Sequence, residues 1–234
     1  MNLNEQAYDY LKSLILSGEL SPGILYSETK FADQVGISRT PMREAIVRLS
    51  HEGLLDIQQS RGFYLHILTV GDLKDMFQMR LALEGYALIH LAKNTEDEEA
   101  RERIALLETN LNQQHKLVAD QADLDLLVKK DRDFHMIMIS YMHNHTLESL
   151  YRNQVYRIQS FARRSFENKE RIHQTLAEHA AIVEALRRND PVDAYRAASV
   201  HLDNLVSLME NMISQDESVP SSLKRQLSFL RKAP

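Results

Sequence analysis

The stretch SETKFADQVGISRTPMREAIVRLSHEGLL at residues 27–55, followed by SRGFYL at residues 60–65, decides the fold of the first part of this chain. Gly36 separates two short amphipathic patterns in which apolar residues recur at helical spacing. Ser38 can cap the second of these helices, because a serine oxygen accepts hydrogen bonds from the free N–H groups of a helix start. Two short helices that meet across a glycine are typical of a helix-turn-helix.

Strand signals follow directly. Residues 55–57 and 63–67 alternate or cluster like strands around a tip at residues 60–62, where glycine makes a positive φ easy. An amphipathic helix over residues 4–16 precedes the motif. The pattern therefore predicts a winged helix-turn-helix domain over residues 1–69.

From residue 72 onward the strand signals stop and long helical patterns begin. Their expected ranges are about 72–93, 95–119, 122–142, 146–167, 170–189 and 191–215. Thr95 with Glu98 forms a capping-box pattern, and Asp190 followed by Pro191 places a cap and then proline at the first helical position. The fold class is mostly α, with an all-α antiparallel helical bundle over residues 70–216. The sequence does not indicate a role for the tail at residues 217–234.

Composition limits the partners of this chain. Its 234 residues contain no cysteine, so any metal ion must be held by nitrogen and oxygen ligands. The net charge is −5, so a DNA contact must come from a local cluster of basic residues. No apolar run is long enough to span a bilayer and the start lacks a signal-peptide pattern, so we expect a cytoplasmic protein without a membrane partner.

The second motif helix carries a candidate DNA-binding cluster. Arg39 and Arg43 lie four residues apart and project from the same side near its start. Guanidinium groups fit guanine edges and phosphates, while the hydroxyls of Ser38 and Thr40 fit phosphate. Arg61 at the hairpin tip can reach the adjacent backbone or minor groove. Solvated surface arginines are the alternative, but the motif spacing, the arginine pair and the glycine-tipped hairpin agree on one DNA-binding module.

Polar metal-ligating residues interrupt apolar stripes of the predicted bundle. Asp131 and His135 lie four apart within one such stripe, and His179 and His201 lie in the stripes of two later helices. A buried carboxylate needs a partner, and a divalent ion of the Zn, Ni or Mn class supplies one. The alternative is a buried Asp–His hydrogen bond with two unrelated core histidines, and the residues alone leave both open.

An arginine and a glutamate also interrupt the inward stripe of the first bundle helix. Arg80 and Glu84 are four residues apart, so their side chains are neighbours on one helix face. A structural ion pair is one interpretation. The other is an effector site, since an arginine near a metal ion can bind an organic carboxylate with two hydrogen bonds.

The quoted stretch resembles the winged helix of GntR-type bacterial regulators over nearly all of residues 4–67. The resemblance implies that Arg39, Thr40 and Arg43 contact DNA at the recognition helix. It also places Arg61 and Gly62 in the wing. One departure is Thr29, where many family members have arginine; it bears on which operator sequence is recognised and not on DNA binding itself.

The bundle resembles the ligand-binding domain of the FadR branch of that family, called the FCD domain. The pieces that carry the resemblance are Asp131-Arg-Asp-Phe-His135, Glu178-His179 and His201-Leu202, in this order and spacing. In metal-binding members the matching aspartate and histidines hold the ion, which implies that Asp131, His135, His179 and His201 do so here. The pattern has an arginine and a glutamate that match Arg80 and Glu84.

The sequence thus predicts a homodimeric transcription regulator, a repressor in our interpretation and not an enzyme. Its two winged helices would contact half-sites of a near-palindromic DNA operator. A small organic acid beside the metal would change operator affinity. Two alternatives stay open. A metal-dependent enzyme is disfavoured because we find no nucleophile motif and no phosphate loop, and a purely structural metal would tie helices together without sensing a ligand.

Overall fold

The computed structural model of this chain describes residues 2–21, 23–67 and 69–215. The chain divides into two compact units, one up to Leu68 and one from Thr69 onward. They are called the N-terminal unit and the C-terminal unit below. The predicted tail at residues 217–234 lies outside the described residues.

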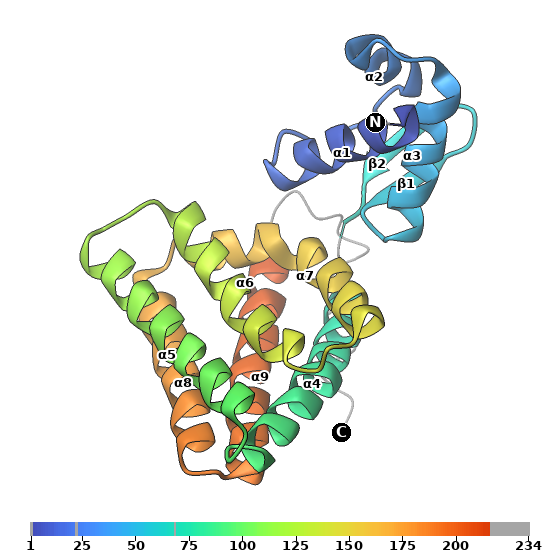
Figure 1. Cartoon of the computed structure of the whole chain (residues 1–234). Helices are drawn as coiled ribbons and strands as arrows, with labels where there is room; N and C mark the ends of the chain where they lie inside the picture. The colour runs from blue at the N-terminus through green and yellow to red at the C-terminus, as the bar shows by residue number, and fades with distance from the viewer. Residues whose placement is uncertain (1, 22, 68, 216–234) are drawn as a thin grey trace. The chain divides into compact units, whose positions relative to one another are not determined.

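The N-terminal unit combines a helix-turn-helix with a β-hairpin (Figure 1). Its elements are α1 (Leu3–Leu16), α2 (Glu28–Val35), α3 (Arg39–His51), β1 (Leu55–Gln58) and β2 (Gly62–Leu65). The two strands pair antiparallel, with Leu55 opposite Leu65 and Gln58 opposite Gly62. Tyr26 adds an isolated bridge to Phe63, whose side chain lies in the core of this unit. The predicted winged helix-turn-helix is confirmed.

Glycines end the helices of this motif as expected. Gly36 follows α2 with φ +72, and its N–H reaches the carbonyl groups of Ala32 and Asp33. Ser27 and Ser38 occupy the predicted N-cap positions, but neither side chain makes a capping hydrogen bond. The hydroxyl of Ser38 is therefore not used by its own helix.

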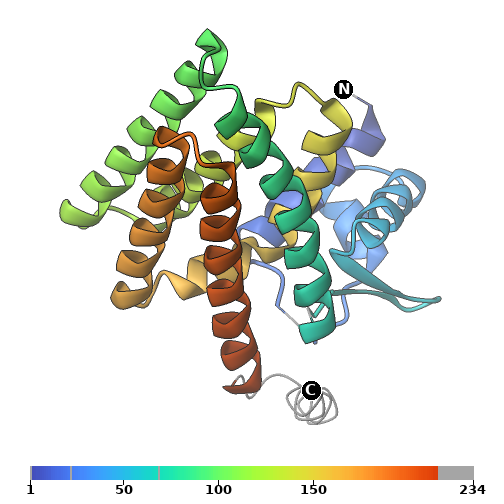
Figure 2. The same ribbon diagram turned by 90° about the horizontal axis from the view of Figure 1, so that it is seen from below.

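The C-terminal unit is a bundle of long helices. They are α4 (Val70–Lys93), α5 (Glu98–Ala119), α6 (Leu124–Ser140), α7 (His145–Ser165), α8 (Lys169–Arg187) and α9 (Pro191–Gln215). Helix α9 packs against both α4 and α8, and α5 packs against α6 and α8. Helix α6 in turn contacts α4 and α7. Figures 1 and 2 show α4, α8 and α9 side by side, and α6 and α7 pack against this group of helices.

Of three helix caps, one differs from the prediction, one was not predicted and one is confirmed. The Thr95 capping box is wrong: α5 begins at Glu98, and its N-cap is Asp97. A capping box instead opens α4, where Thr69 and Asp72 exchange hydrogen bonds between side chain and backbone. The cap before Pro191 is confirmed, since Asp190 Oδ1 accepts hydrogen bonds from the next backbone N–H groups at 3.1 and 2.9 Å. None of the helices in the described residues is long and apolar enough to cross a membrane.

Candidate metal centre and DNA-contacting face

Three histidines from three helices meet inside the C-terminal unit. His135 lies on α6, His179 on α8 and His201 on α9, and each is at most 2% exposed. Their ring centroids are 5.2, 5.2 and 4.9 Å apart, and one nitrogen of each ring lies within 4.8 Å of the others. Apolar residues at helical spacing pack these helices together, and each histidine occupies a core position of its stripe.

The ring nitrogens at the centre of this cluster lack partners. Among the described residues, no hydrogen bond reaches Nε2 of His135, His179 or His201, or Nδ1 of His179. A buried polar atom without a partner costs about 1–3 kcal/mol, so several together need an explanation. A divalent cation supplies one, because imidazole nitrogens at about 2.1 Å are normal ligands of zinc and similar ions. The donor set therefore fits a metal ion.

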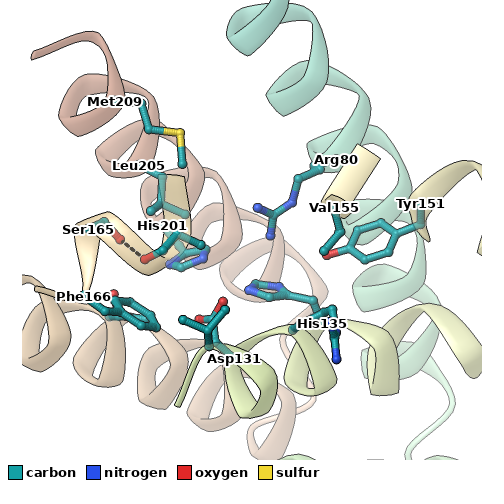
Figure 3. Close-up of a pocket in the computed structure, with 14 residues that line it drawn as sticks. Arg80, Asp131, His135, Tyr151, Val155, Ser165, Phe166, His201, Leu205 and Met209 are labelled. Carbon is teal, nitrogen blue, oxygen red and sulfur yellow. Dashed lines mark hydrogen bonds between the residues drawn. The ribbon is translucent and has the colours of Figure 1, made fainter. Parts of the chain in front are cut away.

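Asp131 lies at the edge of the histidine cluster. Its Oδ1 is 3.7 Å from Nε2 of His179, and its side chain is 17% exposed. In Figure 3 the carboxylate points toward His201 and the space beneath Arg80. The structure thus brings all four predicted metal ligands to one place, with the three histidines closer to one another than the aspartate is to all of them.

The histidines are suited to binding a cation in their neutral form. Burial lowers the pKa of His179 well below its ordinary value, and the neighbouring histidines act in the same direction. Burial also lowers the pKa of His201, and this outweighs its hydrogen bond to Glu178. Metal ligands must be unprotonated, so the lowered pKa of His179 and of His201 favours binding of a metal ion.

Arg80 and Glu84 form a buried ion pair beside the cluster. Arg80 Nε donates to Glu84 Oε1 at 2.8 Å, and Glu84 is fully buried. Burial favours the neutral carboxyl, but the charge of Arg80 and the hydrogen bonds from His135 and Arg80 outweigh it and hold the pKa of Glu84 well below the ordinary value. The two residues differ in access, because Arg80 lines a cavity and Glu84 lies behind it.

That cavity is bounded by Arg80 on one side and by the metal-ligand candidates Asp131, His135 and His201 on the other (Figure 3). It encloses about 30 Å³ that a water-sized molecule can occupy. This is room for about two water molecules, because roughly 10–15 Å³ of such space holds one. A larger ligand must therefore displace side chains such as Met209, whose unbranched chain adapts readily.

Several residues of this region were missed by sequence reasoning. Glu178 is bonded to His201 and to Arg171, and Tyr151 donates to Glu84 at 2.9 Å. Thr175 lines the cavity with a buried hydroxyl that has no hydrogen-bond partner among the described residues. A signal was present on α8, because Arg171, Thr175 and Glu178 follow one another at helical spacing beside its apolar stripe.

The predicted DNA-contacting residues lie on the surface of the N-terminal unit. Ser38, Arg39, Thr40 and Arg43 are exposed at the start of α3, and Arg61 is exposed at the hairpin tip. Within the described part of the chain, neither Arg39 nor Arg61 has an ion-pair partner. These basic groups are available to a polyanion.

Gly62 differs from its neighbours because it is buried. Its φ is +143, and a Cβ atom there would meet the carbonyl oxygen of Tyr26 at 2.0 Å. The Tyr26 strand segment pairs with Phe63 through hydrogen bonds of 2.8 and 3.0 Å. Glycine at this position therefore shapes the wing by letting two backbones approach closely.

Comparisons with known proteins cover both units. Residues 75–204 match the FCD domain family, and residues 3–65 match the family described as bacterial regulatory proteins, gntR family. An uncharacterized HTH-type transcriptional regulator of Bacillus subtilis (strain 168), YdhC, is 25% identical over 90% of this chain and 92% of its own length. The Nta operon transcriptional regulator of Aminobacter aminovorans is 27% identical over 86% of this chain and 94% of its own.

A solved structure shares the fold of this chain. Escherichia coli McbR/YncC aligns over 91% of this chain and 99% of its own, with a TM-score of 0.70 and 19% identity. At this identity the likeness concerns the fold alone.

Proposed function

The chain belongs to the GntR family of bacterial regulatory proteins, in the group that carries an FCD domain, and we propose that its DNA binding responds to a small carboxylate held beside a divalent metal ion. The observation that carries this proposal is the convergence of three unpartnered, buried histidine nitrogens next to a buried arginine. Transcriptional regulation itself agrees with the names of its relatives.

DNA binding is assigned to the exposed face of α3 and to the hairpin. Arg39 and Arg43 would contact base edges or phosphates in the major groove, with Ser38 and Thr40 on phosphate. Arg61 would contact the backbone or the minor groove beside it. Each exposed basic group neutralises a phosphate, so affinity should fall steeply with salt.

The metal site is assigned to Asp131, His135, His179 and His201. The ion, of the Zn, Ni or Mn class, would supply a Lewis-acid position for an anionic ligand. Protein groups would hold the rest of that ligand: Arg80 has its Nε on Glu84 and directs its other nitrogens into the cavity (Figure 3). A planar guanidinium matches a carboxylate with two hydrogen bonds. Glu84 would act behind Arg80 by fixing its orientation.

We infer that two copies of the chain act together on a near-palindromic operator. Helices α4 and α9 pack against each other and carry exposed apolar side chains, including Tyr86 and Tyr195. A second copy that covers such side chains would bury them from water. Two winged helices would then read half-sites about one helical turn or more apart.

A purely structural ion is the second candidate, because the histidines come from three different helices and one ion would tie them together. Elemental analysis, melting temperature and DNA binding separate the candidates.

DNA sequences selected from a random pool by the wild-type protein serve as the operator, and a panel of small carboxylates is titrated. About one ion per chain, with DNA affinity that a carboxylate changes only when the ion is present, supports the sensor. An ion that raises the melting temperature without any carboxylate effect supports the structural role. A metal-free protein from metal-replete medium contradicts both.

A further inference from the structure

Two glutamates, Glu84 fully buried and Glu178 partly buried, each connect an arginine to the outer nitrogen of a cluster histidine. Glu84 Oε2 lies 3.0 Å from Nδ1 of His135, while its Oε1 accepts hydrogen bonds from Arg80 Nε at 2.8 Å and from the Tyr151 hydroxyl at 2.9 Å. The carboxylate is fully buried, Arg80 and Tyr151 both donate to it, and the arginine balances its charge. Glu84 is therefore an ionised acceptor on the outer side of His135.

The second glutamate repeats this arrangement on another pair of helices. Glu178 Oε2 lies 2.7 Å from Nδ1 of His201 and accepts from Arg171 Nη2 at 2.7 Å, while Arg171 Nη1 reaches its Oε1 at 2.9 Å. Asn204 also donates to Oε1 at 2.8 Å. Two guanidinium N–H groups and one amide NH₂ group therefore donate to this carboxylate, and an arginine balances its charge.

An ionised carboxylate can only accept hydrogen bonds, so the histidine nitrogen that faces it must carry the proton. Nδ1 of His135 and of His201 is then the protonated nitrogen, and the lone pair of each neutral ring lies on Nε2. Those are the same two Nε2 atoms that have no partner among the described residues and that face the centre of the cluster.

We propose that Glu84 and Glu178 are positioning residues for the metal centre: each fixes its histidine in the tautomer that presents Nε2, and each makes that nitrogen a stronger donor. This proposal rests on the proposed metal site. Carboxylates behind metal-bound histidines orient the ring and raise its basicity. Here the arginines supply the compensating charge, so each carboxylate lies in an ion pair rather than alone.

His179 is held differently. Neither of its ring nitrogens has a hydrogen-bond partner among the described residues, and its ring stacks on Phe134 at 4.1 Å with an interplanar angle of 11°. Aromatic packing sets the plane of this ring without choosing its tautomer. Two of the three histidines are therefore fixed by carboxylates and the third by stacking.

The test is metal affinity in the full-length protein, with Zn²⁺ as the probe. After removal of metal by a chelator, Zn²⁺ is titrated against a chromophoric competitor, and Co²⁺ absorption reports the ligand field. We expect Glu178→Gln and Glu84→Gln each to weaken Zn²⁺ binding about 10- to 100-fold and to shift the Co²⁺ spectrum. Glutamine keeps the size of the side chain but has no charge, and only one of its two polar atoms can accept a hydrogen bond.

Glu184→Gln is the matched control, since Glu184 lies on the same helix as Glu178 with a side chain that is 53% exposed. It should bind Zn²⁺ as the wild type does. If Glu84→Gln fails to fold because Arg80 loses its partner, Glu178→Gln carries the test, with circular dichroism confirming its fold.

A second measurement needs no variant and no metal. Histidine side-chain ¹⁵N–¹H spectra of the metal-free wild type should show His135 and His201 protonated on Nδ1. Protonation on Nε2, or Zn²⁺ affinity of folded Glu178→Gln equal to that of wild type, would overturn the inference and leave the metal site standing. A wild type that binds no Zn²⁺ would instead remove the proposed metal site itself.

Discussion

The Nε atom of Arg43 lies 3.3 Å from Oε2 of Glu28, so an ion pair joins the start of α2 to the exposed face of α3. The arginine side chain is 61% exposed and the glutamate side chain 12% exposed. Exposed ion pairs contribute only about 0–1 kcal/mol. Glu28 can therefore orient Arg43 without preventing it from exchanging this partner for a nucleic acid.

We expect Arg43→Ala to weaken binding to selected DNA by about 1–3 kcal/mol, because one guanidinium contact to a base edge or phosphate is lost. Fluorescence anisotropy with the DNA selected by the wild-type protein measures this. Arg101→Ala is the control, since Arg101 is an exposed arginine on α5 in the C-terminal unit. Equal affinity of the Arg43 variant and the wild type at several salt concentrations would refute the assignment.

Gly62→Ala should destabilise the N-terminal unit by about 1–3 kcal/mol, the usual cost of overpacking a close contact. The new Cβ would meet the Tyr26 carbonyl oxygen, which is backbone and cannot swing away. Urea unfolding measures the change. Gly71→Ala is the control, because its nearest neighbour in the same test is 3.5 Å away and alanine favours a helix. A Gly62 variant as stable as the wild type would mean that the hairpin does not pass so near Tyr26.

Arg80→Ala should lower the free energy of unfolding of the metal-free protein by about 3–5 kcal/mol, because it leaves the Glu84 carboxylate buried without its counter-charge. Arg163→Ala removes an exposed ion pair with Asp125 at 2.8 Å and should leave stability nearly unchanged, because water screens this pair. Chemical denaturation with chelator present compares the two. Similar small losses in both variants would contradict a tightly buried Arg80–Glu84 pair.

Stability should fall as pH rises beyond about 10. Burial raises the pKa of Tyr8, and its hydrogen bonds to Lys12 and Glu52 add opposing effects. Burial alone would lower the pKa of Lys12, but its bond to Tyr8 and the charge of Glu52 raise it above 10.5. Both groups bind protons more tightly when folded, so their contribution is complete below the unfolded pKa values and is lost as pH rises through the folded ones.

Unfolding of Tyr8→Phe and wild type at pH 8 and pH 11 measures this dependence. The loss between the two pH values should be smaller in the variant, which has no phenol to ionise. An equal loss would assign the alkaline sensitivity to other groups.

Metal removal should lower the melting temperature of the wild type and leave His179→Ala unchanged. An ion at 100 times its dissociation constant stabilises the folded chain by about 2.7 kcal/mol, since it binds the folded state alone. Scanning calorimetry with Zn²⁺ and with chelator measures the difference. A His179→Ala variant that Zn²⁺ stabilises as much as the wild type would place the ion elsewhere.

Local signals predicted the elements of this fold well. Gly36 marks the turn of the helix-turn-helix because a left-handed conformation suits glycine, and Asp190 before Pro191 marks the start of α9. The exception is Thr95: its spacing to Glu98 fits a capping box, but the chain turns later and Asp97 takes the cap position. An observed cap can lie a residue or two from the predicted one, because the apolar pattern that predicts the helix is the same in both cases.

Local signals also predicted part of the candidate site. Asp131 and the three histidines interrupt apolar stripes, which indicates inward-facing polar groups on each helix separately. The bond from His135 to Glu84 spans 51 positions and depends on how two helices are aligned along their axes. The apolar stripe of a single helix does not show how that helix is aligned with its neighbour. The sequence indicated Glu178 only as the neighbour of His179. Adjacent residues on a helix point about 100° apart, so the stripe that contains His179 did not predict the contacts of Glu178.

Helix α4 carries Arg80 and Glu84, and its capping box at Thr69 opens the C-terminal unit directly after the wing. Only residues 66–69 separate β2 from α4, a connection that even fully extended spans at most about 14 Å. The same helix therefore carries Arg80, to which we assign the carboxylate ligand, and the covalent attachment of the N-terminal unit. A ligand that shifts α4 along its axis by one residue, about 1.5 Å, moves that attachment point by the same distance. Under the proposed function, four residues of chain would therefore pass a ligand-induced shift of α4 to the N-terminal unit.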